Sequence, residues 1–524
     1  MQLKKLIQNY KNLISVFLLG AFSFFINYHY GFIGIMPMDN TVLFNGGFRV
    51  LKGYVPFTDY WLVTGPLLDY LNALFFKLLG LSWSTFILHS SSVNVLITIA
   101  SYLLFIKLDL PNKFSFLYAL QISILFYPVV GTPFVDHHST FFLIIAFYLL
   151  ILAIKSSNHN YYIFIPLMMV LSFLSKQTPA VYGVIALFFL ILIHGYYEKK
   201  SLRKIINNSI IGSILGLIFL ILFFWFTKIN LSNFIEQYLL FASSIGNERL
   251  SNYDFNIINE IDNYKFIYLF IFFLLYLFAL SHQKNFLNLK AGLIILVSII
   301  LSIILIFHQM ITLNQNYIFF LVPFLAAIFH SFFNKKFINK YLLFFTILVC
   351  IFSVTKYHLR FNEERKFNEL ENIDISKAVD AVTLDKKLKG LKWITYLNPD
   401  DPDREIKNLK EILQILKSDV DQKILITEYQ VIAPILESYD NSPNQWHHPS
   451  VSFPLKGNKY FEIYKNYFIK KIKENKIRTV YETREDDFTI LELVLNPNCF
   501  FNKKERVSVM LIKMRLNQDC EDLR

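Results

Sequence analysis

Long apolar runs separated by short polar stretches fill the first two-thirds of the chain. Runs of about 20 apolar residues can cross the hydrocarbon core of a bilayer, and shorter runs cross where it is thin. We predict about eleven membrane-spanning helices. Their expected bounds are Leu13–Tyr28, Trp83–Ile106, Phe114–Val130, Thr140–Ile154, Tyr162–Phe173, Ala180–His194, Ile210–Phe226, Phe266–Leu280, Leu293–Phe307, Tyr317–Phe332 and Tyr341–Val354. The pattern predicts an α-helical polytopic membrane protein.

Charge in the connections predicts how these helices are threaded. The first run follows the basic stretch MQLKKLIQNYKN, and no small-residue cleavage site comes after it, so we expect an uncleaved anchor with a cytoplasmic N-terminus. Every connection then assigned to the cytoplasm carries lysine: Lys107–Lys113, Lys155–Tyr161, Tyr196–Asn208, His282–Lys290 and Asn334–Lys340. An odd number of crossings puts the C-terminal part outside. We expect a multi-pass protein of the inner (cytoplasmic) cell membrane.

The composition becomes charged and turn-rich near Lys356. Strand-like runs then alternate with helical patterns, which favours a small α/β domain. We therefore predict a membrane domain at residues 1–355 and an extracytoplasmic soluble α/β domain at residues 356–524. The expected strands are Trp393–Leu397, Ile424–Thr427, Arg478–Glu482 and Val507–Met514, and the expected helices are Asp403–Leu416, Val431–Ser438 and Tyr460–Asn475. Cys499 and Cys520 could pair if this part lies outside the cytosol, and the sequence leaves that open.

Overall composition agrees with a membrane protein, since 54% of the residues are hydrophobic and 17% are charged. The formal net charge of +12 lies largely in short connections between apolar runs, which argues against nucleic acid as a partner and for membrane lipids. The chain contains no GxGxxG, GxxxxGK[ST], HExxH, GxSxG or CxxC motif.

The first connection predicted outside, residues 34–82, is unusually apolar for a loop. Its glycines and prolines exclude one continuous span, so we expect helices lying at the membrane surface. Asp39 and Asp59 stand as isolated acids in its first half. Ionisable groups in such surroundings are costly unless they are paired or used, so both are candidate site residues.

Other chemically capable side chains fall in connections predicted on the same side. They are Asp136, His137 and His138 in GTPFVDHHST, Lys176 and Gln177 in LSKQTP, Glu248 and Arg249, and His308. The centres of the apolar runs are nearly free of charge, whereas a transporter usually carries ionisable groups in mid-span. The distribution favours a site at one membrane face.

The first connection resembles that of the GT-C glycosyltransferases. The matching text is Asp39, then GFRVLKG (Gly47–Gly53), VPFTDYW (Val55–Trp61), Gly65–Pro66 and LGLS (Leu79–Ser82). Within that fold it is similar to the polyprenyl-phosphate-sugar-dependent bacterial branch related to protein mannosyltransferases and aminoarabinose transferases. Asn40 stands where many relatives carry a second acid, and residues 86–89 stand where relatives often carry arginine.

The resemblance implies transfer of a sugar, with inversion, from a polyprenyl-phosphate donor to a hydroxyl of a lipid, glycan or protein acceptor. A carboxylate in a dry environment has raised proton affinity and suits a general base, the role expected for Asp39. The leaving lipid phosphate needs cations rather than a proton. Candidates for donor and phosphate binding are Asp59, His138, Lys176 and Arg249, with Arg49 and Lys52 as further ones. This chemistry requires no cofactor; a divalent metal, if bound, would be held by Asp136 and His137.

Each candidate has a structural alternative. Asp39 could cap a helix, and Asp59 could cap or form a salt bridge. The residues at 136–138 could be a solvated loop, Lys176 could mark a span end, and Arg249 could pair at the surface with Glu248. Asp69 and Asn72 share one face of an expected interfacial helix, which explains them without catalysis.

Two other functions also fit a membrane protein of this composition. One is a transporter or flippase of lipid-linked glycans, and the other is a glycan ligase or polymerase, which would favour several arginines in the Lys228–Lys265 connection; that connection has one.

Overall fold

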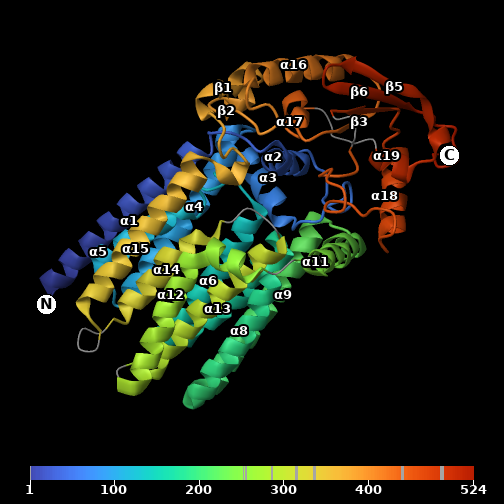
Figure 1. Cartoon of the computed structure of the whole chain (residues 1–524). Coiled ribbons are helices and arrows are strands. Elements are labelled where there is room, and N and C mark those ends of the chain that lie inside the picture. The colour runs from blue at the N-terminus through green and yellow to red at the C-terminus, as the bar shows by residue number, and fades with distance from the viewer. Residues whose placement is uncertain are drawn as a thin grey trace. The chain divides into compact units, whose positions relative to one another are not determined.

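The computed structural model describes residues 2–251, 253, 256–284, 287–312, 317–333, 338–437, 442–483 and 489–523, and it is mostly helical (Figure 1). The chain forms two compact units. The bundle unit comprises Met1–Phe32, Ile87–Phe223 and Asn252–Asn372. The sheet unit comprises Ile33–Phe86, Phe224–Ser251 and Ile373–Arg524. The predicted domain boundary at residue 356 stays a prediction.

Helices make up the bundle unit and much of the rest. They are α1 (Gln2–Tyr30), α2 (Pro37–Leu51), α3 (Leu67–Leu79), α4 (Trp83–Lys107), α5 (Asn112–Leu125), α6 (Val135–Ser156), α7 (Ile165–Ser175), α8 (Gln177–Tyr197), α9 (Leu202–Thr227), α10 (Leu231–Phe234), α11 (Ala242–Ser251), α12 (Ile257–Lys284), α13 (Leu289–Thr312), α14 (Leu321–Ser331), α15 (Lys340–His358), α16 (Pro402–Ser418), α17 (Ile432–Leu436), α18 (Phe461–Glu474) and α19 (Thr489–Val494).

The prediction of a polytopic helical membrane protein is confirmed, while the exact number of crossings stays a prediction. Among the described residues, eight helices are long and apolar enough to cross a membrane. The runs Phe114–Val130, Tyr162–Phe173 and Tyr317–Phe332 correspond to the shorter helices α5, α7 and α14. Proline explains two of these ends, because α5 stops before the YPVVGTPF stretch and α7 begins at a proline-containing first turn. Residues 313–316 and 334–337, within two predicted connections, lie outside the described residues.

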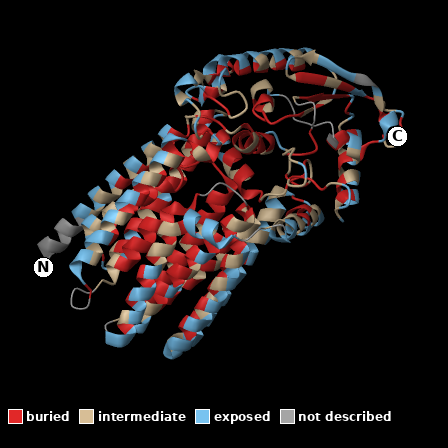
Figure 2. Ribbon diagram, viewed as in Figure 1, coloured by how far each residue is buried: buried red, intermediate tan, exposed pale blue. Residues whose placement is uncertain are grey.

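The outer helices of the bundle unit expose apolar side chains. On α9, Ile210, Ile214, Leu217 and Ile221 are all about half exposed or more. Figure 2 shows exposed residues along the outer helices and buried residues in the middle of the bundle. A helix that is apolar all round and exposed is suited to contact with lipid tails.

A mixed four-stranded sheet organises the C-terminal part. Its order is β3-β4-β6-β5, with β3 parallel to β4 and the other pairs antiparallel. In register, Ile424 pairs with Val480, and Val480 with Met514. These residues share a buried core with Tyr464 and Phe468 of α18. The strands are β1 (Val379–Asp380), β2 (Lys392–Trp393), β3 (Lys423–Ile426), β4 (Thr479–Glu482), β5 (Phe500–Ser508) and β6 (Leu511–Leu516), and β1 pairs with β2 apart from this sheet.

The expected α/β character is therefore found, with local corrections. The run Val507–Met514 is not one strand. The turn that joins β5 to β6 lies within it, at residues 509–510. The predicted strand Trp393–Leu397 is reduced to Lys392–Trp393. Ser438, the end of one predicted helix, lies outside the described residues. Cys499 and Cys520, whose pairing the sequence left open, form a disulfide.

Two adjacent glycines let α2 and α3 approach closely in the sheet unit. A Cβ at Gly46 would lie 2.2 Å from Oδ1 of Asp69, and one at Gly47 would lie 2.5 Å from Cβ of Asn72. The Asn72 amide donates to the Leu43 carbonyl at 3.1 Å. Asp69 and Asn72 are both buried. Asp69 and Asn72 do share one face of α3, as predicted, and the glycines of α2 leave room for that face; the position of α3 at the membrane surface stays a prediction.

We predict that Gly46→Ala lowers the thermal midpoint of the purified protein. The added methyl group overlaps the Asp69 carboxylate, and overpacking of this kind costs about 1–3 kcal/mol. The matched control is Gly246→Ala in α11, where a Cβ meets nothing within 4 Å. There, removing a helical glycine should stabilise the protein by up to about 1 kcal/mol. Equal midpoints for the two variants would contradict the close approach.

Candidate functional site

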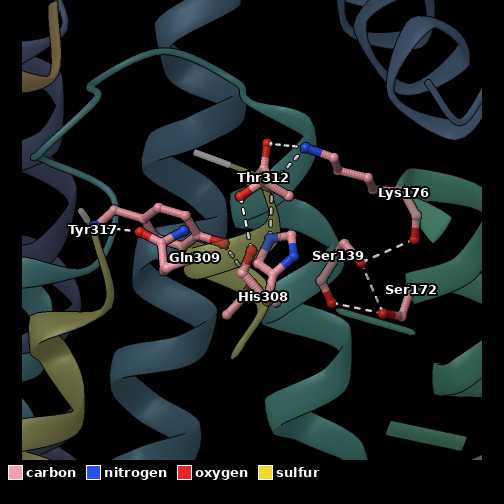
Figure 3. Close-up of polar contacts among 9 residues, drawn as sticks. Ser139, Ser172, Lys176, His308, Gln309, Thr312 and Tyr317 are labelled. Carbon is pink, nitrogen blue, oxygen red and sulfur yellow. Dashed lines mark hydrogen bonds and ion pairs between the residues drawn. The ribbon is translucent and has the colours of Figure 1, made fainter. Parts of the chain in front are cut away.

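A buried carboxylate lies at the start of α6 in the bundle unit. Both oxygens of Asp136 accept hydrogen bonds from the Lys176 ammonium, at 2.7 and 2.8 Å. Nε2 of His308 lies 2.8 Å from Oδ1 of the same carboxylate. Asp136 and His308 are fully buried, and the Lys176 side chain is 17% exposed. Three segments far apart in the sequence therefore meet at one ionic cluster (Figure 3).

A break between two helices turns Lys176 toward this carboxylate. Lys176 has extended backbone angles between the end of α7 and the start of α8. Thr178, which precedes Pro179, is also extended, as residues before proline usually are. The hydroxyls of Ser139 and Ser172 bond each other at 3.0 Å, and Ser139 also donates to the Lys176 carbonyl at 3.3 Å (Figure 3). The LSKQTP segment is thus fastened to α6 beside Asp136.

Neighbouring polar groups fix the His308 side of the cluster. The Thr312 hydroxyl donates to the His308 carbonyl at 2.9 Å. Oε1 of Gln309 accepts from the Tyr317 amide at 3.2 Å, and the Tyr317 hydroxyl bonds Thr140 at 3.1 Å (Figure 3). The end of α13 is thereby tied to α6 and to the segment before α14.

The two histidines after Asp136 point to different partners. The His137 ring stacks on Tyr317, with centroids 4.3 Å apart. Nε2 of His138 lies 3.0 Å from Nε2 of His89, and its Nδ1 bonds the Tyr127 hydroxyl. Because residues 136–138 are all buried, the alternative of a solvated loop is wrong. In the described part of the chain no three His, Cys, Asp or Glu side chains converge as a metal would require, and the roles expected for His137 and His138 stay predictions.

Asp39 lies in the first turn of α2, in the sheet unit. The N-cap of this helix is Met36, followed by Pro37, so the alternative that Asp39 is the cap is wrong. Oδ1 of Asn40 instead accepts from the Met36 amide at 2.8 Å. Asp39 is half-buried. The N-terminal end of a helix favours negative charge.

The remaining candidates of the sheet unit have mixed surroundings. Oδ2 of Asp59 accepts from the Val55 amide at 2.7 Å, and its Oδ1 lies 3.7 Å from the Lys471 ammonium. These contacts fit the turn-closing and salt-bridge alternative. Arg49 is buried, with its guanidinium 4.8 Å from the centre of the Tyr60 ring. Arg249 lies half-buried on α11. Their roles in donor binding stay predictions.

Comparison with known families now bears on these residues. Residues 63–226 match the family described as dolichyl-phosphate-mannose-protein mannosyltransferase. The chain is similar to the mannosyltransferase-like GT-C family. This confirms the resemblance drawn from the first connection, and it supports a membrane glycosyltransferase. The match covers less than half of the chain, and no curated protein matches it.

The GT-C match divides the candidates. It contains Asp136, His137, His138 and Lys176, and it begins after Asp39 and Asp59. Arg249 and His308 follow its end. The LSKQTP and GTPFVDHHST segments, which the ionic cluster brings together, therefore both belong to the part of the chain that carries the family likeness.

Sequence reasoning missed Asp69 as a buried network residue in the first connection. The Tyr60 hydroxyl donates to its Oδ2 at 2.9 Å, and the Gln445 amide lies 3.2 and 3.3 Å from its two oxygens. Burial raises the pKa of the Asp69 carboxyl to about 7. Gly46 was the signal, because two glycines within a helix indicate a close neighbour. Gln445, far along the chain, left no local signal.

We predict that Asp69 makes stability depend on pH. Its pKa rises from 3.8 to about 7 on folding, so the folded protein binds more protons between these values than the unfolded chain. Stability from this group should be greatest below about pH 4, fall toward pH 7 by roughly 4 kcal/mol, and stay level above. Thermal midpoints measured from pH 4 to 8 check this: Asp69→Asn should lose the decline, and Tyr60→Phe should shift it to higher pH. An unchanged decline in Asp69→Asn would refute the assignment.

We also predict that Asp136→Asn destabilises the bundle by about 3–5 kcal/mol, because it removes the carboxylate that balances Lys176. The double variant Asp136→Asn/Lys176→Met should recover much of the loss. Thermal unfolding of the detergent-solubilised protein provides the measurement. The control is Asp109→Asn, whose ion pair with Lys155 is exposed and should contribute about 0–1 kcal/mol. If the double variant is as unstable as the single one, charge balance is not what the cluster supplies.

Proposed function

We propose that the protein transfers a sugar from a polyprenyl-phosphate donor to an acceptor hydroxyl at the extracytoplasmic face of the cytoplasmic membrane, with inversion. The family likeness supports membrane glycosyl transfer in general. The finer statement rests chiefly on the geometry of Lys176, a cation held at the end of a membrane-spanning helix.

Lys176 suits a lipid phosphate for two reasons. An ammonium group carries three donors, and two of them are directed to the oxygens of Asp136. The third can reach a ligand on the partly exposed side of the group. In addition, the Asp136 partner fixes the ammonium in place before a ligand arrives, and fixed charges stabilise a developing anion without reorganisation.

In this proposal the leaving group is the lipid phosphate, which departs as a stable anion. As the acceptor oxygen bonds to the anomeric carbon, the bond from that carbon to the phosphate oxygen breaks, and the acceptor proton passes to Asp39. Lys176 balances the charge that grows on the phosphate, and Arg249, Asp59 and His138 remain candidates for further donor contacts. No cofactor enters these steps.

The disulfide supports the proposed side of the membrane. Cys499 joins Cys520 in the C-terminal part, and structural disulfides persist mainly in oxidising compartments. An extracytoplasmic C-terminal part agrees with the threading predicted from the lysine-containing connections. We therefore propose that the acceptor is also met on this side, as a lipid, glycan or protein.

We predict that Asp39→Asn lowers sugar transfer by about 10²–10⁴-fold, since it removes a general base. Lys176→Gln should lower it by about 10²–10³-fold through lost charge stabilisation. The assay is transfer from a set of radiolabelled polyprenyl-phosphate sugars in isolated membranes. Asp401→Asn is the matched control, because Asp401 caps α16 and asparagine caps equally well.

Two results would count against the proposal. Full transfer by Asp39→Asn would remove that residue as the base. Absence of transfer from every donor by the wild-type protein would instead favour a transporter of lipid-linked glycans.

A further inference from the structure

A hollow opens at the end of the bundle unit that holds Asp136. Its volume is about 260 Å³. Its lining combines charged side chains with aromatic rings from α12, from the segment before α14, and from the end of α15 and the turns that follow. The lining residues are Asp262, Asn263, Lys265, Phe319, Lys356, Tyr357, Arg360, Phe361 and Lys366.

The charges around this hollow do not balance. Asp262 pairs with Lys265 at 2.7 Å. Outside the lining, Glu371 pairs with both Arg360 and Lys366. Four cations thus face two carboxylates. The ammonium of one of them, Lys356, lies 5.7 Å from the centre of the Phe266 ring. Like charges gathered in a partly buried hollow repel one another unless an anion joins them.

The base of the hollow is aromatic. Phe319 stacks on Tyr357 with centroids 3.5 Å apart, and Phe361 lies 5.5 Å from Phe319. All three rings are buried. A rim of cations over apolar rings suits a group with a charged oxygen-rich end and a less polar remainder. Arginine with lysine favours phosphate in particular, because guanidinium binds two phosphate oxygens at once and ammonium adds point charge.

The neighbourhood of the hollow favours a lipid as the carrier of that phosphate. The helices α12 and α15 expose apolar side chains along their lengths, including Phe272, Leu275, Leu348 and Phe352. Pockets that enclose a drug-sized ligand are about 300–1,000 Å³. The smaller volume here accommodates a head group whose apolar chain continues along the exposed helices.

The hollow is adjacent to the ionic cluster but separate from it. Lys366 lines the hollow, and the next residue, Phe367, contacts the His137 ring with centroids 5.7 Å apart. Phe319 follows two residues after Tyr317, on which His137 stacks. Both features therefore lie at the bundle end predicted to face away from the cytoplasm. The positive-inside tendency places surplus lysine and arginine at the opposite end, so it does not explain these four cations.

We propose that this hollow binds the phosphate of a membrane-lipid head group through Lys265, Lys356, Arg360 and Lys366. The site is additional to Lys176 and goes beyond the proposed transfer reaction. It holds whether or not Asp39 acts as a base, because it depends only on the charges and rings around the hollow.

Binding of tritiated farnesyl phosphate to the purified full-length protein tests this. The pocket variant is Lys356→Gln/Arg360→Gln, and the charge-matched control is Lys155→Gln/Lys290→Gln, which removes two partly exposed paired lysines elsewhere on the bundle. Each is also made with Lys176→Gln, so that binding at the proposed donor contact is removed. We expect the Kd of the pocket variant to rise about tenfold or more, because two charge-assisted contacts are lost, and that of the control to stay unchanged.

Competition identifies the chemistry. Unlabelled farnesol, which lacks phosphate, should not displace the probe. Displacement by inorganic phosphate would support a site that reads phosphate alone, and displacement only by phosphatidylglycerol or farnesyl phosphate would support a lipid source. Equal binding by the pocket variant and wild type, displacement by farnesol, or no binding of any phosphate probe would overturn the proposal.

Thermal midpoints of the single variant Lys366→Gln show whether lost binding results from misfolding. A folded single variant with weakened binding supports the site, and one with unchanged binding counts against it. Loss of transfer in Asp39→Asn with intact farnesyl phosphate binding would separate this site from the proposed reaction.

Discussion

A carboxylate inside a membrane-spanning helix must be compensated, and this requirement governs how the bundle is arranged around Asp136. An uncompensated charge in such surroundings costs several kcal/mol. Lys176, between α7 and α8, and His308 of α13 compensate the Asp136 charge, and both bonds are short. The contact therefore sets the relative height of α6, α8 and α13, because a shift of one helical turn would separate the charges by about 5.4 Å. Hydrogen bonds of Ser139, Ser172 and the Tyr317 hydroxyl fix the same end of α6.

The sheet unit meets the same constraint by a different route. Asp69 is as deeply buried as Asp136, and it accepts hydrogen bonds from the neutral groups of Tyr60 and Gln445, with the Arg49 charge nearby. Without an ammonium in contact, burial prevails and raises its pKa to about 7. The Asp69 carboxyl is therefore uncharged below about pH 7, whereas Asp136 has a lysine ammonium in contact. Gly46 makes this possible, since any side chain there would fill the space that Asp69 and Gln445 occupy.

Apolar run length predicted the helical class and the approximate position of every long span, because lipid imposes that length directly. It predicted the ends of α5 and α7 less well, since prolines act there. Charge distribution indicated that Asp136, Lys176 and His308 lie on one side. Their pairing could not be predicted, because His308 lies 172 residues from Asp136 and only the packed bundle brings them together. The burial of Asp69 could not be predicted, because helical periodicity shows which residues share a face, not which face is buried.

The two cationic features of the bundle differ in charge balance, and this difference bears on what each can hold. At the ionic cluster one carboxylate takes two of the donors of Lys176, so a phosphate there gains only a partial interaction in its ground state. In the proposed transfer, such a site would stabilise the charge that grows on the leaving group and would release the product afterwards. Around the neighbouring hollow, four cations face two carboxylates. That surplus is already present before any reaction, so it favours a resident anion over a passing one. If the proposed function holds, charge balance alone would suit the ionic cluster to turnover and the hollow to anchoring a lipid phosphate beside it.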